Sequence, residues 1–219
     1  MELEIPGATR LAFGRRLRAW YRKTARDLPW RRTRDPYHIL VSELMLQQTP
    51  VMRVVPKYGA FLARYPTLES LARARPKQVA EAWSGLGYYA RARNLHKLSR
   101  QIARTNGTLP DDPAALRALP GVGPYTAGAV ASFAYERRAA LVDTNVARVL
   151  IRVFAPGVDP RTNHKLAWTI AAATLPRAGR VAYTQNQALM ELGALVCTAR
   201  VRRCELCPVE GICATRAQS

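Results

Sequence analysis

Two acidic residues stand in surroundings that suit proton-transfer chemistry. Glu43 lies within the apolar stretch 39–46, and Asp143 follows the apolar residues 140–142. Burial would raise the pKa of the glutamic acid and equip it as a general acid at neutral pH, whereas an ionised aspartate can stabilise a developing positive charge. Each also has an ordinary interpretation, because most glutamates face solvent and an aspartate in this setting often caps a helix. We take Asp143 as the first catalytic candidate and Glu43 as the second.

A turn bounded by glycines lies between two predicted helices. Residues 113–119 read as a short helix, Gly121, Val122 and Gly123 form the turn, and Pro124 suits the first turn of the next helix. Amide groups in such a turn beside a helix N-terminus suit a phosphate. We therefore expect a helix-hairpin-helix that binds a nucleic-acid backbone. The alternative is a plain helix end followed by a new helix.

Two further segments carry side chains suited to contact with bases. The segment 47–50 ends a predicted helix with two glutamines, which can pair with base edges or fill a gap in a stack; a polar helix end is the simpler interpretation. The segment 85–93 combines glycines, Tyr88, Tyr89 and two arginines, which supply close backbone approach, stacking surface and charge. This second segment is typical of a loop that enters a duplex.

All four cysteines lie near the end of the sequence, at Cys197, Cys204, Cys207 and Cys213. This clustering is unlike a disulfide framework spread through a secreted fold and indicates one metal site. The spacing C-x6-C-x2-C-x5-C contains a single close pair and no histidine, so it leaves zinc and an iron–sulfur cluster as alternatives.

Helical spacing of apolar residues places these candidates on helices. Residues 8–24 predict one helix and Asp35-Pro36 opens another, while prolines 56, 66 and 76 punctuate the helical pattern between residues 54 and 82. Helices are also expected after Asp143 and near residues 164–175 and 183–196. No segment shows the alternation typical of a strand, so the predicted fold class is all-α.

The composition favours a polyanionic partner. The 219 residues include 34 basic and 15 acidic side chains, a net charge of +19, and all but five of the basic residues are arginine. No run of about eighteen apolar residues predicts a membrane span, and the first residues lack the apolar centre of a signal peptide. We expect a cytoplasmic, nucleoid-associated protein that is a monomer and does not enter membranes.

Together these segments resemble the helix-hairpin-helix, Gly/Pro-Asp superfamily of base-excision DNA glycosylases, and within it the catalytic domain of the MutY adenine glycosylases. The resemblance covers residues 26–213 and is carried by residues 28–31, 42–49, 85–95, 119–128, 142–146 and 186–194 and by the four cysteines. It implies a two-lobed all-α fold: a six-helix barrel at 28–136 that contains the hairpin, and a cluster lobe of 1–27 with 137–219. Double-stranded DNA and an extruded base would lie between the lobes, and the cysteines would hold a 4Fe-4S cluster.

The resemblance also assigns roles. Glu43 would protonate adenine at N7, Asp143 would stabilise the oxocarbenium-like sugar, and Asn145 would orient the attacking species. One carboxyl group must be protonated and the other ionised, and different burial of the two groups can produce this difference. The residues that match the adenine pocket are Arg26, Trp30, Arg31, Gln187 and Glu191. Those that match the groups probing and wedging the duplex are Gln48, Leu86 and Tyr88.

Tyr125 occupies the position where bifunctional relatives carry a lysine that forms a Schiff base. A tyrosine cannot form a Schiff base, so the resemblance implies a monofunctional glycosylase. The base that it would remove is adenine mispaired with guanine or 8-oxoguanine. The sequence departs from the family pattern in two ways. It ends six residues after Cys213, where family members continue into a domain that reads 8-oxoguanine, and Thr144 replaces the usual glycine. The alternative is removal of thymine or uracil opposite guanine, as in short mismatch glycosylases of the same superfamily.

Overall fold

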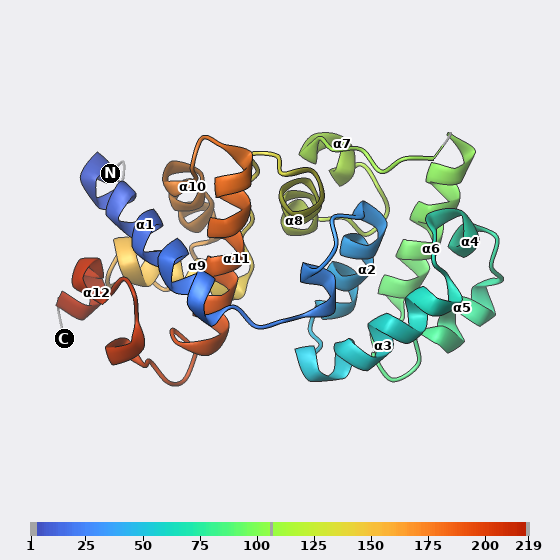
Figure 1. Ribbon diagram of the computed structural model, residues 1–219, viewed down its shortest axis with the longest axis horizontal. Helices are drawn as coiled ribbons and strands as arrows, with labels where there is room; N and C mark the ends of the chain where they lie inside the picture. The colour runs from blue at the N-terminus through green and yellow to red at the C-terminus, as the bar shows by residue number, and fades with distance from the viewer. Residues whose placement is uncertain (1–3, 106, 218–219) are drawn as a thin grey trace. The chain divides into compact units, whose positions relative to one another are not determined.

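The computed structural model describes residues 4–105 and 107–217 (Figure 1). The chain divides into two compact units: residues 27–135, called here the inserted unit, and the segments up to Arg26 and from Glu136 onward, called the terminal unit. Within the described residues every regular element is a helix, and the only β pairing is an isolated bridge between Cys197 and Arg202. The all-α prediction is confirmed. None of the described helices has both the length and the apolar composition required to cross a bilayer.

The inserted unit is built around α2. Its elements are η1 (Pro29–Arg31), α2 (Pro36–Leu46), α3 (Val51–Arg64), α4 (Leu68–Ala72), α5 (Pro76–Ala82), α6 (Ala90–Arg104), α7 (Pro113–Arg117) and α8 (Pro124–Tyr135). Helix α2 packs against α3, α6 and α8, while α4 and α5 pack on α6 and α7 packs on α8 (Figure 1). This packing places the predicted hairpin between α7 and α8.

Side-chain caps explain where these helices begin. The Asp35 carboxylate accepts hydrogen bonds from the amides of Tyr37 (2.8 Å) and His38 (3.0 Å) at the start of α2, and Asp112 caps α7 in the same way. In both helices a proline follows the cap and removes an amide that would have no helical partner. Of the three prolines that punctuate the helical pattern, Pro56 lies inside α3.

Helix α2 has no solvent face over most of its length. Residues 39–45 are all buried, so every turn of this part of the helix is surrounded by protein. A helix of this kind shows no apolar stripe in its sequence. Its polar members, Ser42 and Glu43, are consequently carried into the core of the inserted unit.

Because His96 on α6 is buried, we expect the free energy of unfolding to fall in acid. Burial lowers the pKa of His96 from its ordinary value of 6.5, and the charge of Arg100 acts in the same direction. The unfolded chain therefore binds this proton at a higher pH than the folded chain, so stability is full above pH 6.5 and declines as the pH falls below it. The decline is at most about 1.4 kcal/mol per pH unit for one proton.

This pH effect is measured by urea unfolding between pH 8 and pH 5. The His96→Leu variant is expected to lose less stability over this range than the wild type. Equal losses in the two proteins would contradict the assignment of the acid sensitivity to His96.

The terminal unit is organised by α9 and α11. Its elements are α1 (Gly7–Thr24), α9 (Thr144–Phe154), α10 (His164–Thr174), α11 (Gly179–Leu195), η2 (Cys204–Leu206), η3 (Glu210–Ile212) and α12 (Ala214–Ala217). Helix α11 packs on α1 and α9, and α9 also packs on α10 and α12. The rings of Phe13 and Phe154 meet edge to face at 5.0 Å between α1 and the end of α9.

Helix α11 begins four residues earlier than the sequence pattern predicts. A Cβ at Gly179 would lie 1.6 Å from the carbonyl oxygen of Glu136, so only glycine fits at this helix start. Close backbone approach, rather than a capping side chain, determines where this helix begins.

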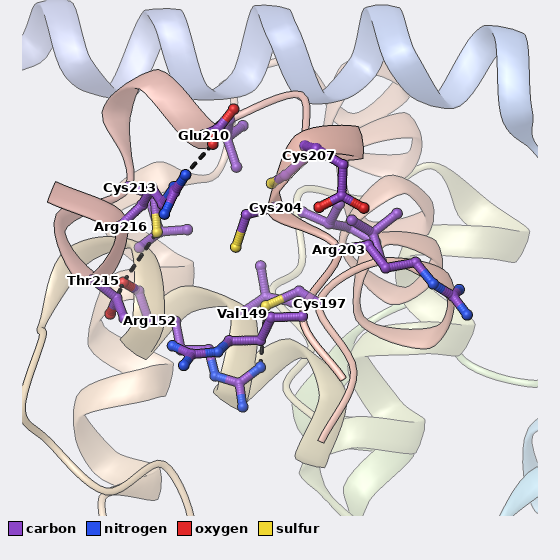
Figure 2. Close-up of a pocket in the computed structure, with 16 residues that line it drawn as sticks. Val149, Arg152, Cys197, Arg203, Cys204, Cys207, Glu210, Cys213, Thr215 and Arg216 are labelled. Atoms are coloured by element: carbon purple, nitrogen blue, oxygen red, sulfur yellow. Dashed lines mark hydrogen bonds and ion pairs between the residues drawn. The ribbon is translucent and has the colours of Figure 1, made fainter. Parts of the chain in front are cut away.

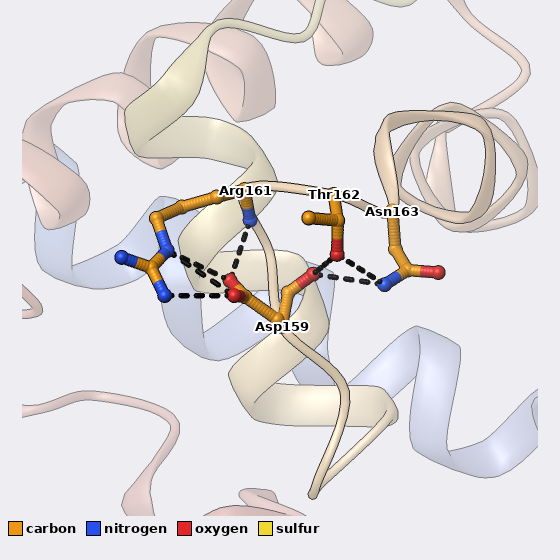
Figure 3. A network of polar contacts seen from close by, with 4 residues as sticks. All are labelled: Asp159, Arg161, Thr162 and Asn163. Atoms are coloured by element: carbon orange, nitrogen blue, oxygen red, sulfur yellow. Dashed lines mark hydrogen bonds and ion pairs between the residues drawn. The ribbon is translucent and has the colours of Figure 1, made fainter.

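The loop between α9 and α10 contains a polar turn formed by residues 159–163 (Figure 3). The Arg161 guanidinium donates to both oxygens of Asp159, and the Asn163 amide donates to the Asp159 carbonyl at 3.0 Å. The Asp159–Arg161 pair is solvent-exposed, so it defines the path of the loop more than it stabilises the fold.

Candidate functional site

Glu43 is a buried carboxyl group in the last turns of α2. It is 3% exposed, with Leu44 and Met45 beside it also buried. The interpretation of Glu43 as a solvent-facing residue is therefore wrong. Burial penalises the charged form of a carboxylic acid, which is the condition that a general acid needs at neutral pH.

Other candidates of the inserted unit differ in how far they reach solvent. Trp30 in η1 is buried, and its ring packs edge to face on Tyr58 at 5.5 Å. Arg31, at the end of η1, and Tyr125, in the first turn of α8, are half-buried. Arg31 and Tyr125 thus combine protein contacts with partial access to solvent.

The hairpin turn is built on α6. Gly121 has φ +77°, and a Cβ there would lie 2.6 Å from the Cβ of Asn94 on α6. Val122 is buried, and its amide donates to the Leu119 carbonyl at 3.2 Å. The Val122 amide is therefore already bonded within the protein, while Gly121 and Gly123 remain exposed.

The residues expected to probe a duplex separate into exposed and buried groups. Gln48 is exposed and Tyr88 is 60% exposed, whereas Leu86 is 2% exposed and packs in the core. The expectation that Leu86 wedges a duplex is corrected, because its side chain does not reach the surface. Met52, in the first turn of α3, is 84% exposed.

Asp143 caps α9 in the terminal unit. Its Oδ1 accepts from the Val146 amide at 2.7 Å and its Oδ2 accepts from the Asn145 side-chain amide at 3.1 Å. The capping interpretation of Asp143 is therefore confirmed. The carboxylate is also half-buried, so capping holds an acidic group in a defined orientation with partial access to solvent.

A buried arginine that the sequence analysis missed supports this pair. Arg148 donates to the Asn145 side-chain oxygen (2.8 Å), the Gly193 carbonyl (2.7 Å) and the Cys197 carbonyl (2.9 Å). A Cβ at Gly193 would lie 2.9 Å from the Cβ of Asn145, so α11 needs glycine where it meets the start of α9. Hydrogen bonds therefore run from Asp143 through Asn145 and Arg148 to the cysteine segment.

Arg26 and Glu191 form an ion pair within the terminal unit, in which the carboxylate is buried and the guanidinium is partly exposed. Glu191 on α11 is fully buried and accepts from the Arg26 Nε (2.9 Å), Nη2 (2.8 Å) and main-chain amide (2.9 Å). Hydrogen bonding to this carboxylate raises the pKa of Arg26. Gln187, one turn earlier on α11, is also buried. The structure thus brings together two of the expected pocket residues and places Gln187 on the same helix.

Removing Arg26 is expected to destabilise the protein. The Arg26→Met variant removes two charged hydrogen bonds from the buried Glu191 carboxylate, and urea unfolding should show a loss of about 3 kcal/mol, the lower end for buried pairs because Arg26 keeps some solvent contact. The matched control is Arg32→Met, which removes an exposed pair with Asp27 and should change stability little. Equal effects of the two substitutions would contradict this account.

The four cysteines line one cavity of about 310 Å³ (Figure 2). It is enclosed by the segment that follows α11, by η2 and η3, and by the α9 residues Val149, Arg152 and Val153. Among the described residues, no three cysteine, histidine or acidic side chains are close enough to hold a single metal ion. Four thiols around one cavity are a donor set that either zinc or an iron–sulfur cluster uses.

Burial keeps two of these thiols in their neutral form. Burial raises the pKa of Cys207 to about 11, and burial raises that of Cys213 as well. Protein alone thus holds these groups as neutral thiols, whereas a bound metal would convert them to thiolates. Arg152 donates to the Cys197 sulfur at 3.3 Å and to the Thr198 carbonyl at 2.7 Å, so a positive charge already lies beside the donor set.

Comparison with known proteins agrees with this geometry. The model of the HhH-GPD superfamily of base excision DNA repair proteins matches residues 41–172. The adenine DNA glycosylase of Mycolicibacterium smegmatis is 47% identical over 196 residues, 88% of this chain and 66% of that protein. The human adenine DNA glycosylase is 43% identical over 217 residues, 94% of this chain and 39% of that protein.

A solved structure of a thermostable thymine-DNA glycosylase superposes with a TM-score of 0.88 at 32% identity, covering 97% of this chain and 98% of that one. The chain thus spans about two fifths of the human relative and just under two thirds of the mycobacterial one, but nearly all of the thymine-DNA glycosylase. The chain belongs to the HhH-GPD superfamily of base excision DNA repair proteins.

Proposed function

We propose that this chain is a DNA N-glycosylase that removes adenine mispaired with guanine or 8-oxoguanine from double-stranded DNA. The observation that carries the proposal is the burial of Glu43 in a helix whose other buried residues are mostly apolar. The adenine DNA glycosylases that are 43% and 47% identical over about nine tenths of this chain support adenine as the base. The net charge of +19 supports a polyanionic substrate.

In the proposed reaction, Glu43 in its acid form donates a proton to adenine N7. The bond between C1′ and N9 then breaks, and its electron pair leaves with the protonated base. The ionised Asp143 stabilises the positive charge that develops on the sugar, and Asn145 orients the attacking water. The water oxygen bonds to C1′ and its proton passes to the Glu43 carboxylate, which restores the acid and leaves the hydroxyl of the abasic site. A buried acid and a half-exposed carboxylate are the pairing that this sequence of steps needs.

Tyr125 supports a reaction without strand cleavage. A phenol cannot form the Schiff base that links a lysine amine to C1′, so the product is an abasic site. Arg26, Trp30, Arg31, Gln187 and Glu191 are proposed to line the base pocket. Gln48, Tyr88 and the hairpin glycines are proposed to contact the duplex.

The four cysteines are proposed to hold a 4Fe-4S cluster, which would brace the loop that follows α11. The exposed Arg200, Arg202 and Arg203 lie between the first two cysteines, where a fixed loop could present them to phosphates. Purified protein is expected to be brown, to absorb broadly near about 400 nm and to contain iron and sulfide in equal amounts. A colourless protein with one zinc per chain would contradict this assignment.

Removal of thymine or uracil opposite guanine is the second candidate. It is favoured by the thermostable thymine-DNA glycosylase, which this chain matches over 98% of its length. The sequence identity of 32% to that protein is lower than the 47% to the mycobacterial adenine glycosylase, so adenine stays the first proposal.

A panel of four duplexes distinguishes the candidates. Single-turnover reactions with A opposite 8-oxoguanine, A opposite G, T opposite G and U opposite G are analysed with and without alkali. We expect alkali-labile sites in the two adenine duplexes and little cleavage without alkali. Release of thymine or uracil alone would establish the second candidate, and labile sites in none of the duplexes would contradict a glycosylase.

A further inference from the structure

A single buried arginine joins two loops of the inserted unit. Arg91 lies in the first turn of α6 and is 7% exposed. Its Nη1 donates to the carbonyls of Leu44 (3.0 Å), Met45 (2.8 Å) and Gln47. Carbonyls at the C-terminal end of a helix have no helical partner, and a cation there is favoured by the helix dipole. Arg91 therefore closes the end of α2 and the start of the loop that follows it.

The other face of the same guanidinium holds the second loop. Its Nη2 donates to the carbonyls of Leu86 and Gly87, both at 3.0 Å, and to the Thr49 hydroxyl at 3.1 Å, while Nε reaches the Tyr88 carbonyl at 3.4 Å. The guanidinium also lies 5.4 Å from the centre of the Tyr88 ring. One planar group thus connects segment 44–49 to segment 86–88.

Each of the two loops contains a non-glycine residue in the left-handed region. Gln48 has φ 54° and Tyr88 has φ 45°, and both side chains are exposed. Such conformations cost on the order of 1–3 kcal/mol and persist only where the surroundings enforce them. Arg91 donates hydrogen bonds to the residues on either side of Gln48 and to the carbonyl of Tyr88. It is therefore the group that holds both residues in the left-handed conformation.

The seven acceptors of Arg91 are six main-chain carbonyls and one hydroxyl, so its buried charge is hydrogen-bonded to neutral groups. Lysine has three donors on one nitrogen and cannot reproduce this planar arrangement. The shape of the group, and not only its charge, is therefore required at this position.

We propose that Arg91 is a positioning residue that presents Gln48 and Tyr88 together to the DNA duplex. The proposal rests on the proposed function, since the two side chains matter only if this surface meets a mismatched base pair. Arg91 itself would touch no DNA. Its role is to hold two surface residues, which are far apart in the sequence, in the conformations that insertion into a base stack requires.

The first test needs no activity. Hydrogen–deuterium exchange is measured for segments 47–49 and 86–89 in the wild type, Arg91→Lys and the control Arg100→Lys, which changes an exposed arginine on the same helix. We expect faster exchange in both segments for Arg91→Lys only, with little change in the melting temperature. Unchanged exchange, or faster exchange spread evenly through the inserted unit, would overturn the proposal.

The second test compares two substrates. On adenine opposite 8-oxoguanine in a stacked duplex, Arg91→Lys should lower the single-turnover rate about tenfold to a hundredfold. On adenine opposite an abasic-site analogue, where less unstacking is needed, the loss should be much smaller. Equal losses on the two substrates, or none, would overturn the positioning role. A wild-type protein that released no base would instead contradict the proposed function, and the exchange experiment would still decide whether Arg91 orders the two loops.

Discussion

Replacing Glu43 by glutamine is expected to lower the single-turnover rate of adenine release by about a thousandfold or more. The substitution keeps the size and polarity of this buried side chain and removes the proton that the leaving base must receive. Because the proposed acid would act in the transition state, binding of DNA should stay within about tenfold of the wild type. Rates are measured with enzyme in excess over a duplex with A opposite 8-oxoguanine, and affinity is measured by titration of the same duplex.

The matched control is Glu81→Gln, an equal change at an exposed position of the inserted unit. Its rate should equal that of the wild type. A loss of DNA binding as large as the loss of rate in Glu43→Gln would indicate a structural role for this residue and would contradict its role as the acid.

The second large effect is expected at Asp143, where one substitution separates catalysis from capping. The Asp143→Asn variant retains an oxygen that can accept from the Val146 amide, so the cap of α9 and the melting temperature should be preserved. It removes the negative charge that would stabilise the sugar cation, and the rate of base release should fall about a thousandfold. Asp143→Ala should lose the same activity and about 1 kcal/mol of stability in addition.

The Asp112→Asn variant is the control, because this residue caps α7 through its side chain as Asp143 caps α9. It should retain both stability and activity. An Asp143→Asn protein with wild-type rate and unchanged stability would show that Asp143 is a helix cap alone.

Several local features of the fold could be predicted because their causes lie within a few residues. Asp35-Pro36 and Asp143 mark helix starts through caps that the sequence displays, and the glycines at 121 and 123 mark the hairpin. The start of α11 could not be predicted, because the glycine at 179 is required by a carbonyl 43 positions away in the sequence.

The burial of Glu43 could not be derived from sequence pattern either. Helix α2 is buried on all sides, so its sequence lacks the periodicity that would assign Glu43 to a face. Arg91 and Arg93 look equivalent in the sequence, yet the structure buries the first and exposes the second. The partners of Arg91 come from two distant loops, and no local pattern indicates such a group.

Glu43 and Asp143 are proposed to act on one extruded nucleotide. The most direct measurement is a crystal structure of the Asp143→Asn variant bound to a duplex with A opposite 8-oxoguanine. We expect the adenine outside the base stack, with the Glu43 carboxyl within hydrogen-bonding distance of N7 and residue 143 facing C1′ of the same nucleotide. An adenine that remains stacked, or either side chain facing a different surface, would contradict the account.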